Sequence, residues 1–496
     1  MAKKTINKEL TGAQDLYNFL FEACNIIRGP VSQDNFKDYI TPLLYYKRIS
    51  DVYDEETEEA LISSGGDKEY ASLPEQHRFV IPDGCHWQEV RERTENFGAA
   101  IVGAMRQIEI ANPDTLYGVL SMFSSQKWTN KAILNDSKIR DLIEHLSKRK
   151  LGNKDYPADL MGDAYEILLK KFADDSKAQA GEFYTPRSVV RLLVHILDPQ
   201  PGETVYDPAC GSGGMLIEAI RYMHDDSLCC GSIFGQEKNV VNAAIAKMNL
   251  FLHGASDFNV MQGDTLRDPK ILQGGNIAKF DCVIANPPFS LENWGATEWS
   301  SDKYKRNIYG TPSDSCGDYA WIQHMICSMV SGQGRMAVVM PQGILFRNQE
   351  TEIRKQLVES DLIEAVVTLG DKLFYGTGLS PCFLIIRRMK PAHHSGRILM
   401  IDGSKILTQK RAQNILEEND IDRLYSLYQN YSDEEDYSRI VTLQEIRDKE
   451  YNLSPNRYVV YHKEEIRPYV EVLAEFKHAY EDVKRLEKEF SLLINA

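Results

Sequence analysis

The chain has 496 residues, enough for about three domains that each bury a core of their own. Apolar residues make up 43% and charged residues 26%, which excludes a disordered chain, and the absence of a long apolar run or a secretory signal favours a cytoplasmic protein over a membrane or secreted one. With 57 Lys and Arg against 72 Asp and Glu, the net charge is -15, so an enzyme of nucleic acids with this chain needs a local basic groove or a basic partner.

The first 150 residues have the pattern of helices. Leu16, Leu20, Ala23 and Ile27 follow one helix face, and a second apolar run covers residues 36–46. Helical patterning resumes from 87 to about 150 after a segment, 51–87, to which the sequence assigns no role. We therefore predict an N-terminal helical domain over residues 1–150.

Between 151 and 400, short β-rich runs alternate with helical segments. Strands separated in this way indicate an α/β domain with a mostly parallel, Rossmann-like sheet and helices on both faces. The predicted strands cover residues 204–206, 232–235, 258–261, 281–285, 336–340, 363–368 and 382–387.

The last part of the chain, 401–496, reads as a helical extension that is acidic and polar. Its end, 464–494, is amphipathic, with apolar residues at every third or fourth position from Ile466 to Leu493. Such a stripe suits packing either on a helix of a partner or on the core of the same chain.

A glycine-rich turn follows the first predicted strand. Asp207 and Pro208 lead into Gly211, Ser212 and Gly213, where glycines let a ligand approach the backbone. The turn lacks the dinucleotide pattern G-x-G-x-x-G, and the chain contains no phosphate-binding G-x-x-x-x-G-K-[ST] motif, which argues against ATP hydrolysis.

Two further carboxylates follow the next two strands. Glu237 stands where a carboxylate can bind both hydroxyls of a ribose, and Asp264 where one can accept a hydrogen bond from an adenine amino group. The alternatives are a solvated strand end for Glu237 and a turn cap for Asp264.

The apolar strand at 281–285 ends in Asn286, Pro287, Pro288 and Phe289. The amine of a nucleobase is a poor nucleophile, and two acceptors, the Asn286 side-chain oxygen and the Pro287 carbonyl, would help its nitrogen to attack. The prolines fix the turn, and Phe289 offers a face on which a flipped-out base can stack.

The nine cysteines form no metal-binding pattern, so we expect no metal site. Pro381-Cys382 has the residues of a nucleophile dipeptide, but Cys382 opens a late strand, and we interpret it as a core residue.

The motifs described so far resemble those of the S-adenosylmethionine-dependent amino-methyltransferases of DNA. The residues that carry this resemblance are Asp207, Glu237, Asp264 and 286–289. Upstream, residues 181–187 are similar to that family's additional cofactor motif, which implies that Phe183, Tyr184, Thr185 and Pro186 bind the cofactor's methionine end. The order of the motifs is that of the group that methylates adenine N6. Four more segments extend the resemblance to the modification subunit of type I restriction–modification systems: 36–40, 248–254, 340–347 and 451–454.

The resemblance implies that the chain methylates DNA site-specifically and binds a separate specificity subunit, two copies to one, with a restriction or motor subunit joining later. No recognition module for DNA follows residue 390, which agrees with a separate specificity subunit. Two alternatives stay open: methylation of RNA or of a protein glutamine, and a scaffold subunit that binds cofactor without turnover. The segment 291–309 matches nothing in the family, and we interpret it as a candidate loop over the target base.

Overall fold

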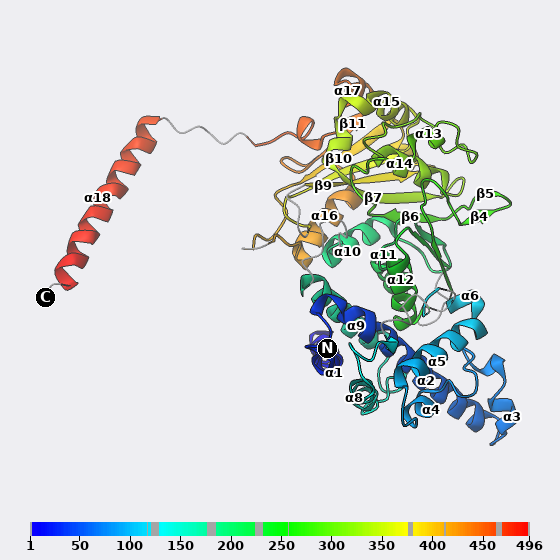
Figure 1. Cartoon of the computed structure of the whole chain (residues 1–496). Helices are drawn as coiled ribbons and strands as arrows, with labels where there is room; N and C mark the ends of the chain where they lie inside the picture. Colours follow the sequence, from blue (N-terminus) through cyan, green and yellow to red (C-terminus); the bar gives the residue numbers. More distant parts are fainter. Residues whose placement is uncertain are drawn as a thin grey trace.

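The computed structural model describes residues 2–116, 118–120, 128–175, 185–223, 232–255, 257–374, 380–410, 413–462 and 469–494. Its N-terminal part is helical, as the sequence predicts, and lies below the sheet in Figure 1. The helices of this part are α1 (Ala2–Ile27), α2 (Phe36–Ser63), α3 (Lys68–Ala71), α4 (Trp87–Arg91), α5 (Phe97–Ala111), α6 (Pro113–Leu116), α8 (Asp136–Leu146) and α9 (Ala158–Asp175).

The helical part has its own apolar core, which also includes one helix of the α/β part. The predicted apolar face of α1 is buried in this core. Helix α12 (Val240–Leu252) contributes Phe251, whose ring meets that of Tyr45 edge-on at 5.1 Å between centroids. The helical part therefore packs directly against the sheet-bearing part.

A nine-stranded sheet forms the upper part of Figure 1, in the order β11-β10-β8-β9-β7-β6-β1-β2-β3. Five of its neighbouring pairs are parallel, and β9 runs antiparallel between β7 and β8. The predicted α/β fold with a mostly parallel sheet is thus confirmed. Its strands are β1 (Val205–Asp207), β2 (Ile233–Glu237), β3 (Phe258–Gln262), β6 (Cys282–Ala285), β7 (Arg335–Pro341), β8 (Ile363–Leu369), β9 (Pro381–Arg387), β10 (Arg397–Gly403) and β11 (Ser438–Thr442). A separate short ribbon pairs β4 (Leu272–Gln273) with β5 (Asn276–Ile277).

Helices cover both faces of the sheet, and each face has its own core. In β6, Ile284 belongs to one core and Val283 to the other, because successive side chains of a strand point to opposite faces. One face carries α10 (Arg187–Leu197), α11 (Gly214–Met223), α12 and α16 (Glu418–Asn430); the other carries α14 (Asp318–Cys327), α15 (Thr351–Glu359) and α17 (Leu443–Asp448). The short helix α13 (Ala296–Trp299) precedes α14.

The prediction that residues 401–496 form a helical region is wrong in one respect, because this part of the chain also contributes strands to the sheet. β10 crosses residue 400 and pairs in parallel with β8, and β11 adds an antiparallel edge to the sheet. β11 is a short edge strand with two half-buried side chains and one exposed side chain, so its apolar alternation is weak in the sequence. The division of the chain at 150 and 400 stays a prediction.

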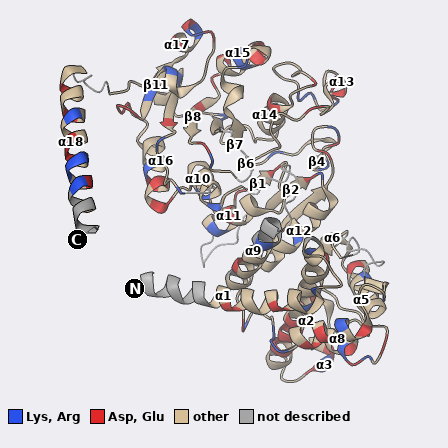
Figure 2. Cartoon of the chain, turned by 60° about the vertical axis from the view of Figure 1, so that its left-hand side comes forward, with Lys and Arg blue, Asp and Glu red and all other residues tan. Residues whose placement is uncertain are grey.

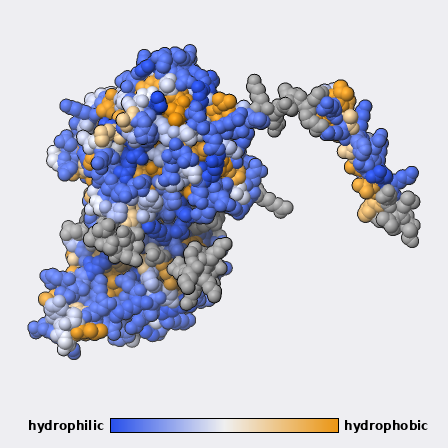
Figure 3. All heavy atoms as spheres, turned by 180° about the vertical axis from the view of Figure 1, so that it is seen from behind, coloured by the Kyte–Doolittle hydropathy of each residue, from blue (hydrophilic) through white to orange (hydrophobic). Residues whose placement is uncertain are grey.

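The last helix, α18 (Tyr469–Ile494), stands apart from the rest of the chain (Figure 1). Figure 3 shows apolar atoms on its surface, and Phe476 and Phe490 are each about two-thirds exposed, at 66% and 65%. Ile466, the first residue of the predicted stripe, lies outside the described residues. No helix among the described residues is both long and apolar enough to span a membrane.

Candidate functional site

The site begins where β1 ends at the edge of the central sheet. Asp207 is 2% exposed, and its Oδ1 accepts a hydrogen bond from the Ala209 amide at 2.9 Å. Burial raises the pKa of Asp207 to about 8, and the neighbouring Glu237 carboxylate acts in the same direction. This end of the sheet therefore holds a buried carboxyl group that a nearby positive charge would favour in its ionised form.

The glycine-rich turn lies directly after Asp207. Gly211 and Gly213 have φ angles of +53° and +84°, a conformation that side-chain-bearing residues rarely adopt. A Cβ at Gly211 would meet no atom within 4 Å among the described residues, so its backbone faces open space. The turn thus offers bare backbone to a ligand.

Glu237 holds this turn in place from the end of β2. Its Oε2 accepts the Gly211 amide at 3.0 Å, and its Oε1 accepts the Asn239 amide at 2.7 Å at the start of α12. Glu237 is therefore not only a solvated strand end: it joins the glycine turn to the next helix.

Asp264 lies at the corresponding end of β3 and is engaged by its own surroundings. Lys238 Nζ approaches its Oδ2 at 2.9 Å, and the Arg267 amide donates to its Oδ1 at 3.2 Å. The second contact is that of a turn cap, so binding of adenine by Asp264 stays a prediction.

Asn286 follows β6, the strand on the other side of β1. Its Nδ2 donates to Thr185 Oγ1 at 2.8 Å, while its buried Oδ1 has no hydrogen-bond partner among the described residues. An unsatisfied buried acceptor costs free energy, so its presence points to a donor that a ligand would supply.

The rest of the Asn-Pro-Pro-Phe motif forms a rigid exit from the strand. Pro287 is buried, Pro288 is exposed, and the half-buried Phe289 ring lies 6.4 Å from that of Phe374. All described peptide bonds here are trans. Phe289 thus has one side against the protein core and part of its surface accessible.

One pocket brings several of the predicted residues together. Its lining includes Thr185, Asp207, Gly211, Ser212 and Asn286. Three other predicted residues are next to these in the chain: Pro186, Pro208 and Gly213. Glu237 is joined to them by its hydrogen bond with Gly211. The predicted Phe183 and Tyr184 lie outside the described residues. Motifs separated by about 100 residues of sequence therefore meet at one edge of the sheet.

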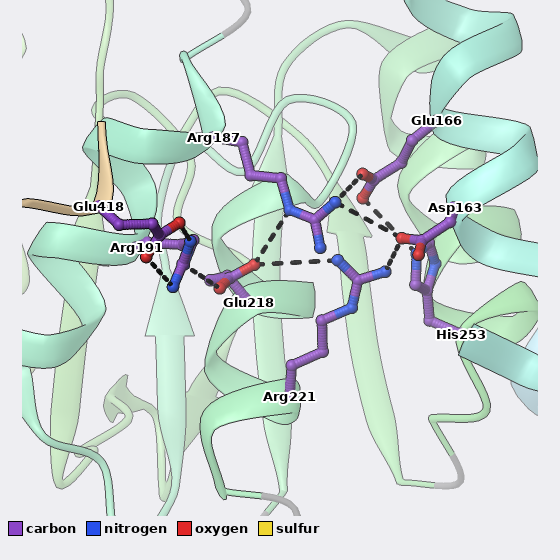
Figure 4. Close-up of polar contacts among 8 residues, drawn as sticks. All are labelled: Asp163, Glu166, Arg187, Arg191, Glu218, Arg221, His253 and Glu418. Carbon is purple, nitrogen blue, oxygen red and sulfur yellow. Dashed lines mark hydrogen bonds and ion pairs between the residues drawn. The ribbon is translucent and has the colours of Figure 1, made fainter. Parts of the chain in front are cut away.

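The pocket is also lined by charged residues that are not among the predicted site residues. Glu166 of α9, Arg187 at the start of α10 and Glu218 of α11 contribute to its wall. Arg187 lies 3.5 Å from Asp163, 3.8 Å from Glu166 and 3.7 Å from Glu218, measured between the nearest nitrogen and oxygen atoms (Figure 4). Arg221 donates to Asp163 at 2.6 Å. Only Arg187, next to Pro186, has a sequence signal; the others come from separate helices.

His253 borders this charge cluster, which we define as Asp163, Glu166, Arg187, Glu218 and Arg221. Its Nδ1 binds the Asn249 carbonyl at 2.8 Å, and its Nε2 lies 3.5 Å from Glu166 Oε1. Burial lowers the pKa of His253 to about 3 and raises that of Glu166. The cluster thus sets three carboxyl groups against two guanidinium groups, and Figure 4 shows these side chains facing one another.

The segment 291–309 packs against the body of the protein. Trp299 is 2% exposed, and Arg306 stacks on its ring at 4.4 Å. The Arg306 guanidinium donates to the carbonyls of Thr265 and Leu266, each at 2.8 Å, directly after Asp264. The segment is thus anchored to the loop after β3; its contact with a target base stays a prediction. Cys382 is buried within β9, as predicted.

Comparison with known proteins gives two family matches. Residues 156–466 match the N-6 DNA methylase family, and residues 16–146 match the HsdM N-terminal domain. The chain is 35% identical over 471 residues to the type I restriction enzyme MjaVII methylase subunit of Methanocaldococcus jannaschii, covering 90% of this chain and 78% of that protein. It is 31% identical over 360 residues to the HindI methylase subunit of Haemophilus influenzae, covering 70% and 76%.

A solved structure agrees with these matches. The methyltransferase subunit of a type I restriction–modification system from Streptococcus thermophilus superposes with a TM-score of 0.77 at 26% identity, covering 91% of this chain and all of that one. Both the helical part and the sheet are thus similar to a type I methyltransferase subunit.

Proposed function

The chain belongs to the N-6 DNA methylase family as the catalytic modification subunit of a type I restriction–modification system, and from this premise we propose that it methylates adenine N6 in DNA with S-adenosylmethionine. The resemblance seen in the sequence is confirmed, and the alternatives of RNA or glutamine methylation and of an inert scaffold are not favoured. The buried, unsatisfied Asn286 Oδ1 is the single observation that carries the proposed chemistry.

The residues around the glycine turn fit S-adenosylmethionine. The open backbone at Gly211 and Ser212 would receive the cofactor, with the Glu237 carboxylate at its ribose and Asp264 at its adenine. Glu237 accepts the amides of Gly211 and Asn239, and these two bonds hold its carboxylate beside the glycine turn, where the ribose would lie. When bound, the cofactor supplies an activated methyl group on a sulfonium centre.

The charge cluster suits the methionine end of the cofactor. That end carries an ammonium and a carboxylate, and the sulfonium beside them is positive. Glu166 and Glu218 would attract the cationic groups, and Arg187 the carboxylate. The carboxyl groups of the cluster outnumber its guanidinium groups, which also favours a ligand with net positive charge.

Asn286 would act on the target amine. Its Oδ1 accepts a hydrogen bond from the exocyclic amino group, with the Pro287 carbonyl as the second acceptor, which draws the nitrogen lone pair out of the ring system. The Thr185 hydroxyl fixes the orientation of the amide, because an Asn286 side chain that donates through Nδ2 to Thr185 must direct Oδ1 elsewhere. Phe289 would stack on the flipped base.

A partner would supply DNA affinity and sequence recognition. In Figure 2, Lys and Arg are scattered among Asp and Glu along the elements in view, and the chain has a net charge of -15. Binding to phosphates depends on clustered cations. The exposed apolar residues of α18 offer a docking face for a specificity subunit, with two modification subunits for each, and a restriction subunit would join that complex.

Methyl transfer tests the proposal. The full chain, co-expressed with its specificity partner, is incubated with tritiated S-adenosylmethionine and unmethylated genomic DNA. We expect label in DNA with the wild type and a loss of at least a hundredfold with Asn286→Ala, at unchanged cofactor affinity. Label in RNA or protein instead of DNA would contradict the proposal.

A further inference from the structure

The loop that carries the Asn-Pro-Pro-Phe motif is held at its far end by a buried carboxylate. Ser290, the residue after Phe289, has a left-handed φ of +50°, and its amide donates to Asp318 Oδ1 at 2.7 Å. Asp318 is the first residue of α14 and is completely buried, at 0% exposed. This bond is charge-assisted and short, as such bonds generally are.

Arg347 holds Asp318 in turn. Its Nη2 donates to the second oxygen of Asp318, its Nε donates to Glu350 Oε2 at 3.0 Å, and its Nη1 lies 3.4 Å from Ser290 Oγ. Arg347 is itself fixed by its backbone, since its amide donates to the Gly343 carbonyl at 2.9 Å and its carbonyl accepts from Arg354 at 2.9 Å. The guanidinium therefore has little freedom to move.

A contribution to stability does not by itself explain why Asp318, Glu350 and Arg347 lie together in the interior. Asp318 and Glu350 are two buried acids that face one arginine, and Glu350 Oε1 has no hydrogen-bond partner among the described residues. A buried ion pair is often no more stable than well-packed apolar residues of similar volume. A role in fixing the conformation of the adjacent loop accounts for the arrangement.

The loop is thus fastened at both ends. Asn286 is bound to Thr185 at the end of β6, and Ser290 is bound to Asp318 four residues later, with two prolines and Phe289 between them. We propose that Asp318 and Arg347 are positioning residues for methyl transfer, because they set the course of the loop that presents Asn286 and Phe289 to the base. This inference rests on the proposed function of that loop.

Kinetics of the full chain with its co-expressed specificity partner test the inference. In Asp318→Asn, the amide oxygen can still accept from Ser290, but the charge that binds Arg347 is lost. Arg347→Met removes the guanidinium and keeps an unbranched side chain. We expect kcat for methylation of genomic DNA to fall about tenfold to a hundredfold in each, because small displacements of reacting groups cost rates of this size. The Kd and KM for S-adenosylmethionine should stay within about twofold.

The double variant and a conservative variant separate positioning from general damage. If Arg347 acts through Asp318, then the double variant loses no more rate than the worse single variant, since the two effects are not additive. Arg347→Lys keeps a cation beside Asp318 and should recover part of kcat.

The matched control is Glu364→Gln. Glu364 is a buried acid, 2% exposed, that binds Arg387 in the same sheet and has no hydrogen bond to the 286–290 loop among the described residues. This variant should leave kcat within about twofold.

Three results would overturn the inference: unchanged kcat in both single variants, equal losses of kcat in the control, or loss of cofactor binding and of the cooperative melting transition in both. The last result would mean that Asp318 and Arg347 stabilise the fold as a whole and do not specifically position the 286–290 loop. Failure of the proposed function is distinguishable, because then the wild-type complex itself transfers no methyl group to DNA.

Discussion

Replacing Asn286 by alanine should separate activity from stability. The side chain makes one hydrogen bond, from Nδ2 to Thr185, and leaves its buried Oδ1 without a partner among the described residues. Asn286→Ala removes both the bond and the unsatisfied acceptor. The methyltransferase should therefore lose its chemistry while the free protein loses little.

The magnitudes follow from these two groups. A hydrogen bond contributes about 0.5–1.5 kcal/mol to stability, and a buried unsatisfied acceptor costs about 1–3 kcal/mol. The free energy of unfolding of Asn286→Ala should thus lie between about 0.5 kcal/mol below and about 2.5 kcal/mol above that of the wild type. Loss of a positioned polar group at the reacting centre costs about a hundred- to a thousandfold in rate, or about 2.7–4 kcal/mol.

Asn112 provides the matched control. It is a buried asparagine of the helical part whose side chain makes three hydrogen bonds, two with the backbone of Val80 and one with the Ile108 carbonyl. Asn112→Ala should lower the free energy of unfolding by about 1.5–4.5 kcal/mol, because it removes three hydrogen bonds of about 0.5–1.5 kcal/mol each. Its rate of methyl transfer should equal that of the wild type at a temperature where the variant is folded.

The assay combines calorimetric unfolding, cofactor titration and tritiated methyl transfer on the three proteins. Methylation by Asn286→Ala within tenfold of the wild type would refute the role of Asn286 in activating the amine. A loss of more than about 2 kcal/mol of stability would refute the claim that its Oδ1 is reserved for a ligand.

Four further predictions follow from the same geometry. Glu237→Ala should weaken S-adenosylmethionine binding by about 1.5–3 kcal/mol in a calorimetric titration, the value of bonds to a charged group, and unchanged affinity would remove Glu237 from the site. Phe289→Trp should keep more methylation activity than Phe289→Ala, since base stacking is worth about 1–3 kcal/mol; equal activities would argue against stacking. Because burial raises the pKa of Asp207 from 3.8 to about 8, the folded chain retains a proton that the unfolded chain releases, and its stability falls as the pH rises between these values. Without cofactor, Asp207→Asn should therefore gain in melting temperature over the wild type more at pH 8.5 than at pH 5, and an equal gain at both would contradict the burial effect. Deleting residues 464–496, which include the exposed α18, should abolish co-purification with the specificity partner while cofactor affinity stays the same; a truncated chain that still assembles would rule out this docking face.

The central strands were predictable because they are buried on both faces. β6 is a continuous apolar run, and β8 is apolar except for Glu364 and Thr368, which is close to the pattern of strands buried beneath two layers of helices. β11 escaped prediction because an edge strand of five residues, three of them partly or fully exposed, has little apolar pattern. β10 escaped because its apolar run spans the predicted boundary at residue 400.

The candidate site was predictable where its residues follow strands. Asp207 ends β1 and Asn286 comes directly after β6, and parallel strands end at one edge of the sheet, so the motifs themselves imply that the two residues meet. Glu166, Glu218 and Asp318 lie on helices, and only the packing of those helices brings them to the pocket or the loop. Nothing local in the sequence distinguishes them from solvated helix residues.

Identification of the methylated nucleoside tests the central claim most directly. Unmethylated DNA is treated with S-adenosylmethionine and the complex of the full chain with its specificity partner, digested to nucleosides and analysed by mass spectrometry. The arrangement of Asn286 and Phe289 beside the Asp207 pocket predicts N6-methyladenine, absent when Asn286→Ala replaces the wild type. Methylated cytosine, or N6-methyladenine at the same level with Asn286→Ala, would contradict it.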